Sequence, residues 1–344
     1  MRPFRYQRAA DVAGAVATVS ADSRAAYLAG GTNLVDLMKL GVEAPELVVD
    51  IGHLPLDGVE YPAAGGTVAG LRVGAGVRNS DLAADRVVRT RYPALAQALL
   101  SAGSGQLRNV ATVGGNLLQR SRCLYFQDVT KPCNKRVPGS GCPAVEGEHR
   151  NLAILGAGPA CVATHPSDMA VALAAFDAVV LVTDADGSRA VPLDGLYASP
   201  ADDPRRDTTL GHGALVTAVE VPPLAFGHRS AYRKVRDRAS FAFAVASVAA
   251  ALDVDDGVVR DVRLAFGAVA HRPWRARVAE EALRGRPATE DVFRRAAEAE
   301  LAAARPLRDN AFKVPLVRNV VARTLADLAD AAEVEGLVDE RSMR

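Results

Sequence analysis

The feature that most constrains this chain is a long segment without regular periodicity, running from about Ser121 to Asn151. Neither helical nor alternating spacing of apolar residues runs through it, and proline and glycine interrupt it repeatedly. A loop of this length inside a compact domain is usually functional or disordered. Function is favoured because all four cysteines of the chain lie in it or just beyond it: Cys123, Cys133, Cys142 and Cys161.

Clustered cysteines in a chain without a strong secretory signal indicate a metal or cluster before disulfides. Thiolates bind iron and zinc tightly because they are soft, anionic donors. The spacing matches neither the CxxC pairs of zinc ribbons nor the run of a bacterial ferredoxin. An iron–sulfur cluster, a zinc ion and two disulfides therefore all stay open, in that order of preference. Nearby cations would offset the charge of a four-thiolate cluster: Arg120, Arg122, Lys131, Lys135 and Arg136.

Two Gly-Gly bends form a second candidate site. Gly30-Gly31-Thr32-Asn33 follows a predicted strand at 25–29 and opens a helix that ends at Gly41. Glycine lets the main chain approach a ligand, and a helix start adds partial positive charge, which suits a phosphate. Gly114-Gly115-Asn116 repeats this chemistry, so the pair suits a dinucleotide. A single such bend is more often only a tight turn, and neither is a GxGxxG fingerprint or a P-loop.

Four further polar residues have a structural and a functional interpretation. Ser167 or Asp168 is predicted to cap a helix, and a side chain there also suits a polar part of a bound cofactor. His165 lies near Cys161, but a structural role is favoured over metal binding. Lys234 lies in a predicted strand, either solvated or placed to stabilise negative charge on a bound ring. No Ser-His-Asp order, HExxH motif or carboxylate pair supports hydrolysis.

Strands followed by helices predict an α+β protein, with a boundary near residue 225 after Pro222-Pro223. An Asp255-Asp256-Gly257 turn predicts a hairpin. The other predicted strands are 46–51, 67–76, 178–184, 214–222, 230–235, 241–254 and 258–269. The predicted helices are 81 onward after a cap at Asn79-Ser80, 93–102, 168 onward, 274–284, 289–304 and 313–333.

Charge and hydropathy narrow the classes of partner. The net charge of +1 gives no reason to expect nucleic acid or a membrane surface. No run of about 18 apolar residues predicts a transmembrane helix. The N-terminus has only a weak apolar run, so export on its own signal is not expected.

Six segments, in order, resemble the FAD-binding subunits of the xanthine dehydrogenase and carbon monoxide dehydrogenase family: LAGGTNLVDLMKLG, RNVATVGGNLLQ, ATHPSDMAVALAAFDA, LVTAVEVP, YRKVRDRASFAFAVASVAAAL and FGAVAHRPWRA. The resemblance implies a bilobed PCMH-type (vanillyl-alcohol-oxidase-like) FAD-binding domain over residues 1–223. Its lobes would be about 1–55 and 56–223, with an iron–sulfur loop inserted at 121–161. A CO-dehydrogenase-flavoprotein-type C-terminal domain, an antiparallel sheet plus helices, would cover 224–344.

The same resemblance implies the cofactor-binding residues. Gly30, Gly31, Thr32 and Asn33 would bind the FAD pyrophosphate, and Thr112, Gly114, Gly115 and Asn116 would form its second cradle. Asp168 would meet the ribityl or phosphate region, and Lys234 would lie near the isoalloxazine. The implied set is completed by Leu28, Ala29, Leu34 and Asn109. No catalytic residue is expected, because the substrate chemistry would belong to a partner subunit.

The cysteine segments NLLQRSRCLYFQDVTKPCNKRVPGSGC and CVATHPSDMA are similar to FAD subunits of bacterial periplasmic aldehyde oxidoreductases, which carry a [4Fe-4S] cluster. The resemblance implies this cluster on the four cysteines and raises iron–sulfur above zinc. It is less close to 4-hydroxybenzoyl-CoA reductase, whose FAD subunit also carries an inserted cluster.

The implied assembly is a heterotrimer with a large molybdenum-cofactor (molybdopterin) subunit and a small subunit bearing two [2Fe-2S] clusters. Electrons from an aldehyde would reach this FAD and then an external acceptor. The expected location is the cytoplasm, or the periplasm by export on a partner's twin-arginine signal. The alternatives are a xanthine dehydrogenase or hydroxybenzoyl-CoA reductase type of subunit, a free-standing flavin oxidase, and a zinc-stabilised nucleotide-binding or scaffold module without redox activity.

Overall fold

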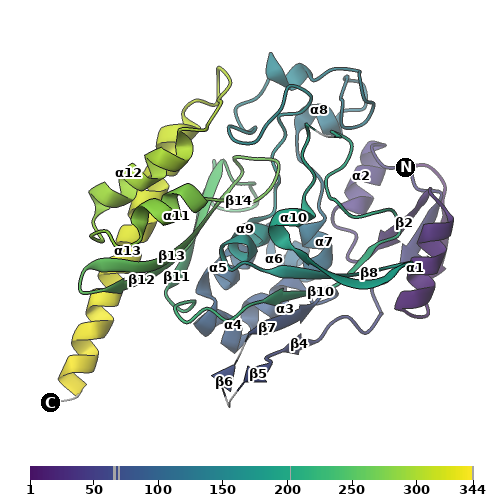
Figure 1. Cartoon of the computed structure of the whole chain (residues 1–344). Helices are drawn as coiled ribbons and strands as arrows, with labels where there is room; N and C mark the ends of the chain where they lie inside the picture. The colour runs from purple at the N-terminus through teal and green to yellow at the C-terminus, as the bar shows by residue number, and fades with distance from the viewer. Residues whose placement is uncertain (65–66, 69, 202, 343–344) are drawn as a thin grey trace.

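The computed structural model describes residues 1–64, 67–68, 70–201 and 203–342, arranged as three units side by side (Figure 1). Residue 69, in the predicted strand at 67–76, lies outside the described residues, as do 65, 66, 202, 343 and 344 of the predicted domains. Segregated sheets and helices confirm the α+β class. Within the described part of the chain, no helix combines the length and apolar character that crossing a membrane requires.

The N-terminal unit is a small parallel sheet of order β1-β3-β2. Its central strand begins with a buried apolar run, Leu47 to Val49, as is usual for parallel strands covered on both faces. The first Gly-Gly bend lies between β2 and α2, so this unit positions the bend. The elements are β1 (Arg5–Arg8), α1 (Val12–Ala21), β2 (Ala25–Leu28), α2 (Leu34–Leu40) and β3 (Leu47–Asp50).

The middle unit contains an antiparallel sheet of order β4-β7-β10-β8-β9 and a small β5-β6 pair. Every residue of α9 is buried, as expected for a helix enclosed by other elements on all sides. The strands are β4 (Val59–Glu60), β5 (Ala63–Ala64), β6 (Thr67–Val68), β7 (Leu71–Gly74), β8 (Val179–Asp184), β9 (Gly187–Pro192) and β10 (Leu215–Val221). The helices are α3 (Asn79–Ala84), α4 (Arg86–Arg91), α5 (Pro93–Ser101), α6 (Gly105–Arg108), α7 (Val113–Leu117), α9 (Asp168–Ala175) and α10 (Leu193–Leu196).

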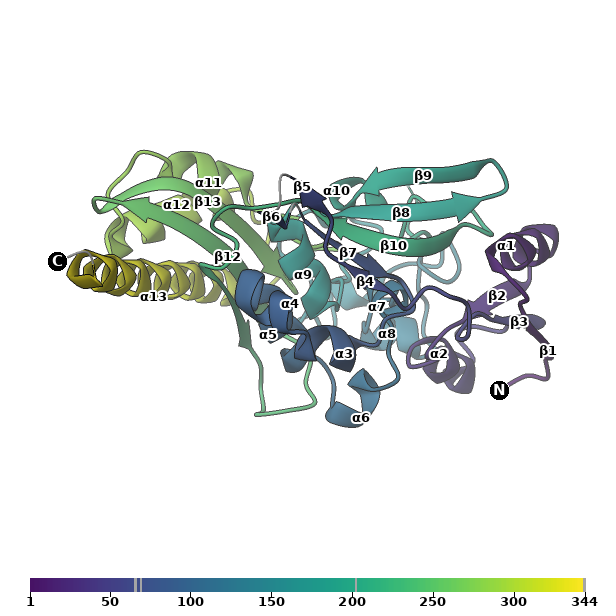
Figure 2. The same cartoon turned by 90° about the horizontal axis from the view of Figure 1, so that it is seen from below.

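The C-terminal unit is an antiparallel sheet of order β11-β12-β13-β14. Helix α13 packs on this sheet, and α5 and α9 of the middle unit pack against it as well, which buries most of β12. Figure 2 shows α13 at one end of the molecule and the N-terminal unit at the other. The elements are β11 (Ser230–Val235), β12 (Ala246–Asp255), β13 (Val258–Gly267), β14 (Trp274–Arg275), α11 (Arg277–Leu283), α12 (Glu290–Leu301) and α13 (Lys313–Ser342).

The segment between α7 and α9, here called the cysteine loop (residues 118–167), lies at the top of Figure 1. The expectation of no regular structure is nearly right, since it contains only α8 (Leu124–Gln127) and a 3-10 turn, η1 (Pro143–Val145). A small apolar core of its own holds it together, built around Phe126, Ala144 and Val162. Leu37 of α2 belongs to the same core, so the loop is packed onto the N-terminal unit.

Several predicted elements differ in detail from the structure. The strand predicted at 241–254 begins only at Ala246, because Phe241 has a left-handed backbone (φ 51°) that ends strand geometry. The helix predicted from residue 274 begins at Arg277, after the short strand β14. The helix predicted to follow an Asn79-Ser80 cap already includes Asn79. The Asp256-Gly257 turn is confirmed, with both residues at positive φ.

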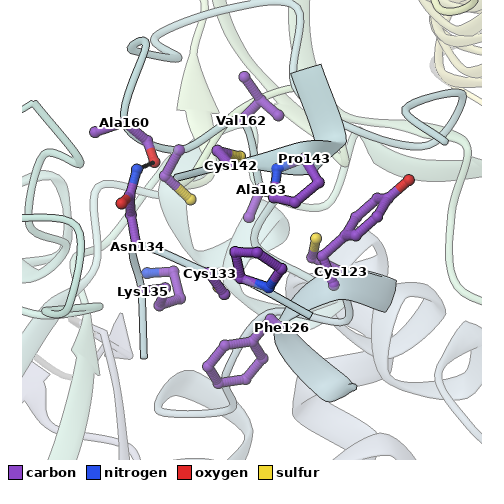
Figure 3. A pocket seen from close by; sticks show the side chains of 13 residues that line it. Cys123, Phe126, Cys133, Asn134, Lys135, Cys142, Pro143, Ala160, Val162 and Ala163 are labelled. Atoms are coloured by element: carbon purple, nitrogen blue, oxygen red, sulfur yellow. Dashed lines mark hydrogen bonds between the residues drawn. The ribbon is translucent and has the colours of Figure 1, made fainter. Parts of the chain in front are cut away.

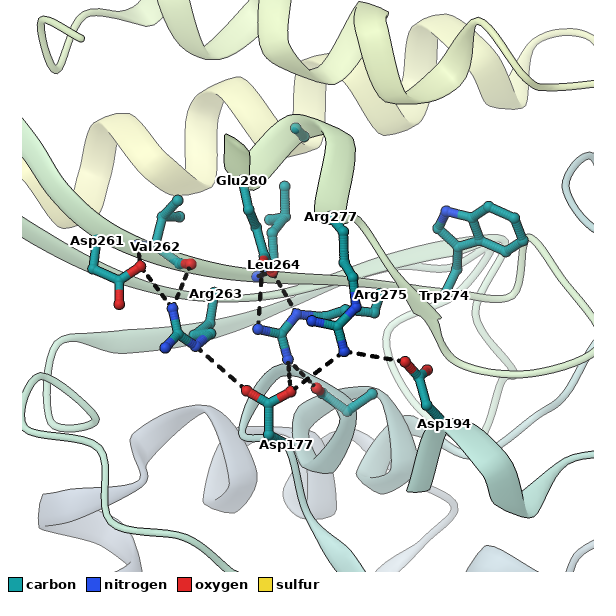
Figure 4. Close-up of polar contacts among 12 residues, drawn as sticks. Asp177, Asp194, Asp261, Val262, Arg263, Leu264, Trp274, Arg275, Arg277 and Glu280 are labelled. Atoms are coloured by element: carbon teal, nitrogen blue, oxygen red, sulfur yellow. Dashed lines mark hydrogen bonds and ion pairs between the residues drawn. The ribbon is translucent and has the colours of Figure 1, made fainter. Parts of the chain in front are cut away.

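Arg275 of β14 joins the C-terminal unit to the middle unit (Figure 4). Its guanidinium donates to the carbonyl of Ala174 at 2.7 Å, near the end of α9, and to Asp177 at 2.7 Å. Glu280 of α11 accepts from the same guanidinium, and its Oε1 also accepts from the Leu264 N–H at 2.7 Å. The side chains of Arg275 and Glu280 are each only 3% exposed, so this pair is fully buried.

We predict that Arg275→Leu lowers the free energy of unfolding by about 3–5 kcal/mol, because it removes the buried charge that pairs with Glu280 and leaves it only the longer, 3.7 Å contact with the exposed Arg284. Urea denaturation followed by circular dichroism measures the loss. Arg277→Leu is the matched control, because its side chain is 62% exposed where it pairs with Asp194, and it should cost less than about 1 kcal/mol. Equal losses in the two variants would contradict a special role for Arg275.

Candidate functional site

The two Gly-Gly bends lie against each other through their main chains in the structure. A Cβ at Gly30 would lie 2.1 Å from the carbonyl oxygen of Val110, which precedes the second bend. Only glycine allows this approach of two main chains. Gly31 adds a left-handed backbone (φ 71°), which turns the chain into α2. The bends predicted separately from sequence therefore form one continuous surface.

The second bend lies inside the short helix α7, where the sequence analysis expected a turn. Thr112 caps this helix, with its hydroxyl accepting from the Gly115 N–H at 3.2 Å. A Cβ at Gly115 would meet only that hydroxyl, at 3.1 Å, so space remains open there. The Asn116 amide oxygen instead accepts from Ser167 at 2.7 Å and from Gln119 at 2.6 Å, which ties α7 to the start of α9.

A long groove passes over both bends. Two cavities of about 180 and 450 Å³ form it, and they share Gly31, Thr32, Asn33 and Gly115. The smaller one continues to Tyr27 and Ile51, and the larger one to Lys234. Ala29, Gly30, Leu34, Thr112 and Gly114 also line the smaller cavity. This shape places the glycines at the middle of the groove, where the diphosphate of a dinucleotide would lie between two larger ends.

Two side-chain amides that line the groove each have one buried atom without a hydrogen-bond partner. These atoms are Asn33 Nδ2, at the first bend, and Asn79 Oδ1, at the start of α3. Buried polar groups are normally paired, so both are suited to a polar ligand. The sequence predicts Asn79 only as a helix cap, because no sequence signal distinguishes that role from a ligand contact. Leu28 and Asn109 line neither cavity, since Leu28 ends β2 beside Gly31 and Asn109 follows α6.

Asp168 and Lys234 form a buried ion pair in the larger cavity, here called the wide end of the groove. Lys234 Nζ lies 2.8 Å from Asp168 Oδ2 and also donates to the Ser101 carbonyl at 3.1 Å. The Tyr232 hydroxyl donates to the other carboxylate oxygen of Asp168. Burial raises the pKa of Asp168, and the lysine and the tyrosine oppose that rise. The pair fixes the lysine ammonium at the groove wall, where it can attract negative charge on a bound ring.

The four cysteines are free thiols that line one small cavity inside the cysteine loop. Figure 3 shows Cys123, Cys133 and Cys142 around it. Burial raises the pKa of Cys123 to about 11, so a cationic ligand is needed to favour its thiolate. Among the described residues, no three His, Cys, Asp or Glu side chains come together as a ready-made site for a single metal ion. The donor set and its enclosure fit a thiolate-bound group.

The cationic side chains that lie near the cysteines in sequence make different contacts in the structure. Lys135 lines the cysteine cavity and lowers the pKa of Cys161 against the larger raising effect of burial. Arg122 instead pairs with Asp36 at 2.8 Å, and Arg136 donates to main-chain carbonyls. Only tertiary contacts determine which of these charges faces the thiols.

Cys123 also connects the cysteine cavity with the groove. It lines a further cavity of about 230 Å³ that shares Arg122, Asp168 and Phe243 with the wide end of the groove. The arginine stacks over the Phe243 ring at 5.1 Å. A group bound by the cysteines would therefore lie close to a ring bound at Lys234.

His165 has a structural environment, as the sequence analysis favoured. Its ring is buried and lies 4.5 Å from the ring of Tyr197. Nε2 lies 3.3 Å from the Leu117 carbonyl, and Nδ1 accepts weakly from the Ser167 N–H. These partners fit the neutral tautomer with its proton on Nε2. Burial lowers the pKa of His165 to about 4.

Comparisons with known proteins agree with this geometry. Residues 2–224 match the family described as the FAD binding domain in molybdopterin dehydrogenase. Residues 230–328 match the CO dehydrogenase flavoprotein C-terminal domain.

Individual relatives match over almost the whole chain. The aldehyde oxidoreductase FAD-binding subunit PaoB of Escherichia coli K12 is 46% identical, over 95% of this chain and 98% of its own length. The glyceraldehyde dehydrogenase medium chain of Sulfolobus acidocaldarius is 28% identical, over 85% and 84%. A carbon monoxide dehydrogenase structure from Hydrogenophaga pseudoflava superposes with a TM-score of 0.73 at 25% identity, covering 96% of this chain and 98% of that one.

We predict that Gly115→Ala folds normally but binds FAD about tenfold or more weakly, because the new methyl group projects into open space at the middle of the groove. Alanine also favours a helix, so α7 should persist. Fluorescence titration of FAD-depleted protein gives the dissociation constant. Gly105→Ala is the control, because a Cβ there meets nothing within 4 Å in α6, outside the groove. Unchanged affinity in Gly115→Ala would contradict the assignment.

We also predict that acid destabilises the chain through His165. Its pKa is about 4 in the folded chain and about 6.5 in the unfolded chain, so the unfolded state binds more protons between these values. The free energy of unfolding should fall by up to roughly 3 kcal/mol as the pH drops from 6.5 to 4. Urea denaturation across this range should show a shallower pH dependence for His165→Gln than for wild type. The exposed His228→Gln should match wild type, and parallel curves for all three proteins would rule out this contribution.

Proposed function

Because this chain belongs to the family of FAD-binding subunits of the xanthine and CO dehydrogenase type, we propose that it is the FAD and [4Fe-4S] electron-transfer subunit of a molybdenum-dependent aldehyde oxidoreductase. The chain is an oxidoreductase flavoprotein. Its proposed partners are a large molybdenum-cofactor subunit and a small [2Fe-2S] subunit. We propose that the first oxidises an aldehyde to a carboxylic acid and the second delivers the electrons.

The observation that carries the proposal is the position of four free thiols beside a dinucleotide groove. FAD, when bound, supplies the acceptance of electrons and their release to an external acceptor. In our proposal the glycine bends hold its diphosphate, and Lys234 lies beside its ring. The thiols Cys123, Cys133, Cys142 and Cys161 would hold the cluster, and iron is the preferred metal because the cysteine segments resemble those of aldehyde oxidoreductase FAD subunits that carry a [4Fe-4S] cluster.

This chain contributes binding and orientation, and its residues suggest no substrate chemistry of their own. Asp168 is occupied by Tyr232 and Lys234, so its carboxylate is held as a structural partner of the lysine. His165 is buried and neutral, with both ring nitrogens engaged. Neither group is available as a general base for an aldehyde hydrate. The aldehyde chemistry therefore falls to the proposed molybdenum subunit.

We predict that full-length chain purified without oxygen contains FAD and about four irons, as one [4Fe-4S] cluster requires. Cys142→Ser should lose most of the iron while still folding and binding FAD, because it removes one of the thiols that line the cavity. Metal analysis and the flavin absorption spectrum give both quantities. Val137→Ser is the matched control, since this side chain lies exposed in the same loop.

The outcomes separate the candidate functions. One zinc per chain and no iron would favour a zinc-stabilised module, and disulfide-linked cysteines would exclude a metal site. A chain that oxidises aldehydes alone would favour a free-standing flavin oxidase. Activity on aldehydes only after co-expression with a molybdenum subunit and a [2Fe-2S] subunit supports the proposal. Activity on purines or aromatic thioesters there would favour the xanthine dehydrogenase or hydroxybenzoyl-CoA reductase type.

A further inference from the structure

A partly buried chain of charges runs from the cysteine cavity to the first glycine bend. Lys135 lines the cavity with its side chain 7% exposed, and its Nζ donates to Asp207 Oδ1 at 2.7 Å. Asp207 Oδ2 accepts from Arg120 Nε at 2.6 Å. The Arg120 main-chain N–H donates to the Asn33 amide oxygen at 3.1 Å. Four residues, two of them in the cysteine loop, therefore link the thiols to the dinucleotide groove.

The contacts around this charge chain leave Arg120 little freedom. Glu43, just after α2, accepts from its guanidinium, and the Arg205 carbonyl accepts at 3.2 Å. The guanidinium also lies 4.7 Å from the ring of Phe126, in the apolar core of the cysteine loop. A displacement of the cysteine loop would therefore move Arg120 directly.

Helix α2 provides a second link between the same two sites. It begins immediately after Asn33, and its Leu37 is buried in the core that contains Cys123 and Cys161. Its Asp36 pairs with Arg122, the neighbour of Cys123. The helix that positions the first glycine bend is therefore packed against the cysteine loop, so an ordered loop stabilises both the helix start and Asn33.

We propose that Arg120, Asp207 and Lys135 are positioning residues that couple occupancy of the cysteine site to FAD affinity. The inference rests on the proposed function, because it needs a group bound by the cysteines. An occupied site orders the loop, holds Lys135 against Asp207, and keeps Arg120 and Asn33 in place at the groove. Coupling between two sites is reciprocal, so bound FAD must equally stabilise the metal group.

The test compares FAD affinity in iron-loaded and iron-stripped full-length chain. Fluorescence titration of FAD-depleted protein should show about five- to twentyfold tighter binding when iron is loaded. In Asp207→Asn this ratio should fall to within about twofold of unity. Asp203→Asn is the matched control, because it makes the same charge change nearby at a carboxylate whose ion pair is with the exposed Arg205, and it should keep the wild-type ratio.

A second variant, Lys135→Met, tests the coupling independently of any folding defect in Asp207→Asn. Lys135→Met breaks the charge chain at the cysteine end and leaves the contact between Arg120 and Asn33 intact. It should also lower the ratio towards unity. A merely structural role would weaken FAD binding equally with and without iron and leave the ratio unchanged.

The reciprocal measurement is the rate of iron loss to a chelator, which should be slower with FAD bound in wild type but not in Asp207→Asn. An equal FAD affinity of iron-loaded and iron-stripped wild type, or a wild-type ratio in both variants, overturns the coupling and leaves the proposed function standing. A wild-type chain that binds FAD but never holds iron overturns both.

Discussion

The main-chain contact between Gly30 and Val110 is the constraint on which the rest of the structure depends. A side chain at residue 30 would force apart two segments that lie far apart in sequence, since its Cβ would come within 2.1 Å of the Val110 carbonyl. With glycine there, the N-terminal and middle units close on each other, and one groove passes over both bends. The diphosphate site that we assign is thus a product of backbone packing.

The cysteine loop is held in place although it contains little regular secondary structure. Ordering a long segment with little secondary structure costs conformational entropy, which must be offset by contacts. Here the contacts are a small apolar core that includes Leu37 of α2, and ion pairs made by Arg122 and Lys135. These contacts attach the loop to the elements that bear the glycine bends. The loop is consequently part of the cofactor site's support, and the proposed cluster would add to that support.

The wide end of the groove depends on the junction between the middle and C-terminal units. Lys234 comes from β11, whereas Asp168 begins α9, and the ion pair between them spans that junction. Arg275 fixes the other end of α9 to the C-terminal sheet. Sequence pattern identified Lys234 and Asp168 separately. It missed that Phe241 to Phe243 line the groove, because their apolar alternation is the same as that of a strand.

The sequence by itself determined the local features: the first glycine bend, a helix cap at Ser167 or Asp168, the Asp256-Gly257 hairpin turn, and the gathering of all cysteines in or just beyond one irregular segment. Such features depend on backbone preferences and spacing over a few residues, so they can be read from short stretches. Only the tertiary structure decided that Gly30 meets Val110, that Lys135 and not its neighbouring arginines faces the thiols, and that Asn79 lies in the groove. These contacts join residues that are distant in sequence, so their geometry forms only when the chain packs.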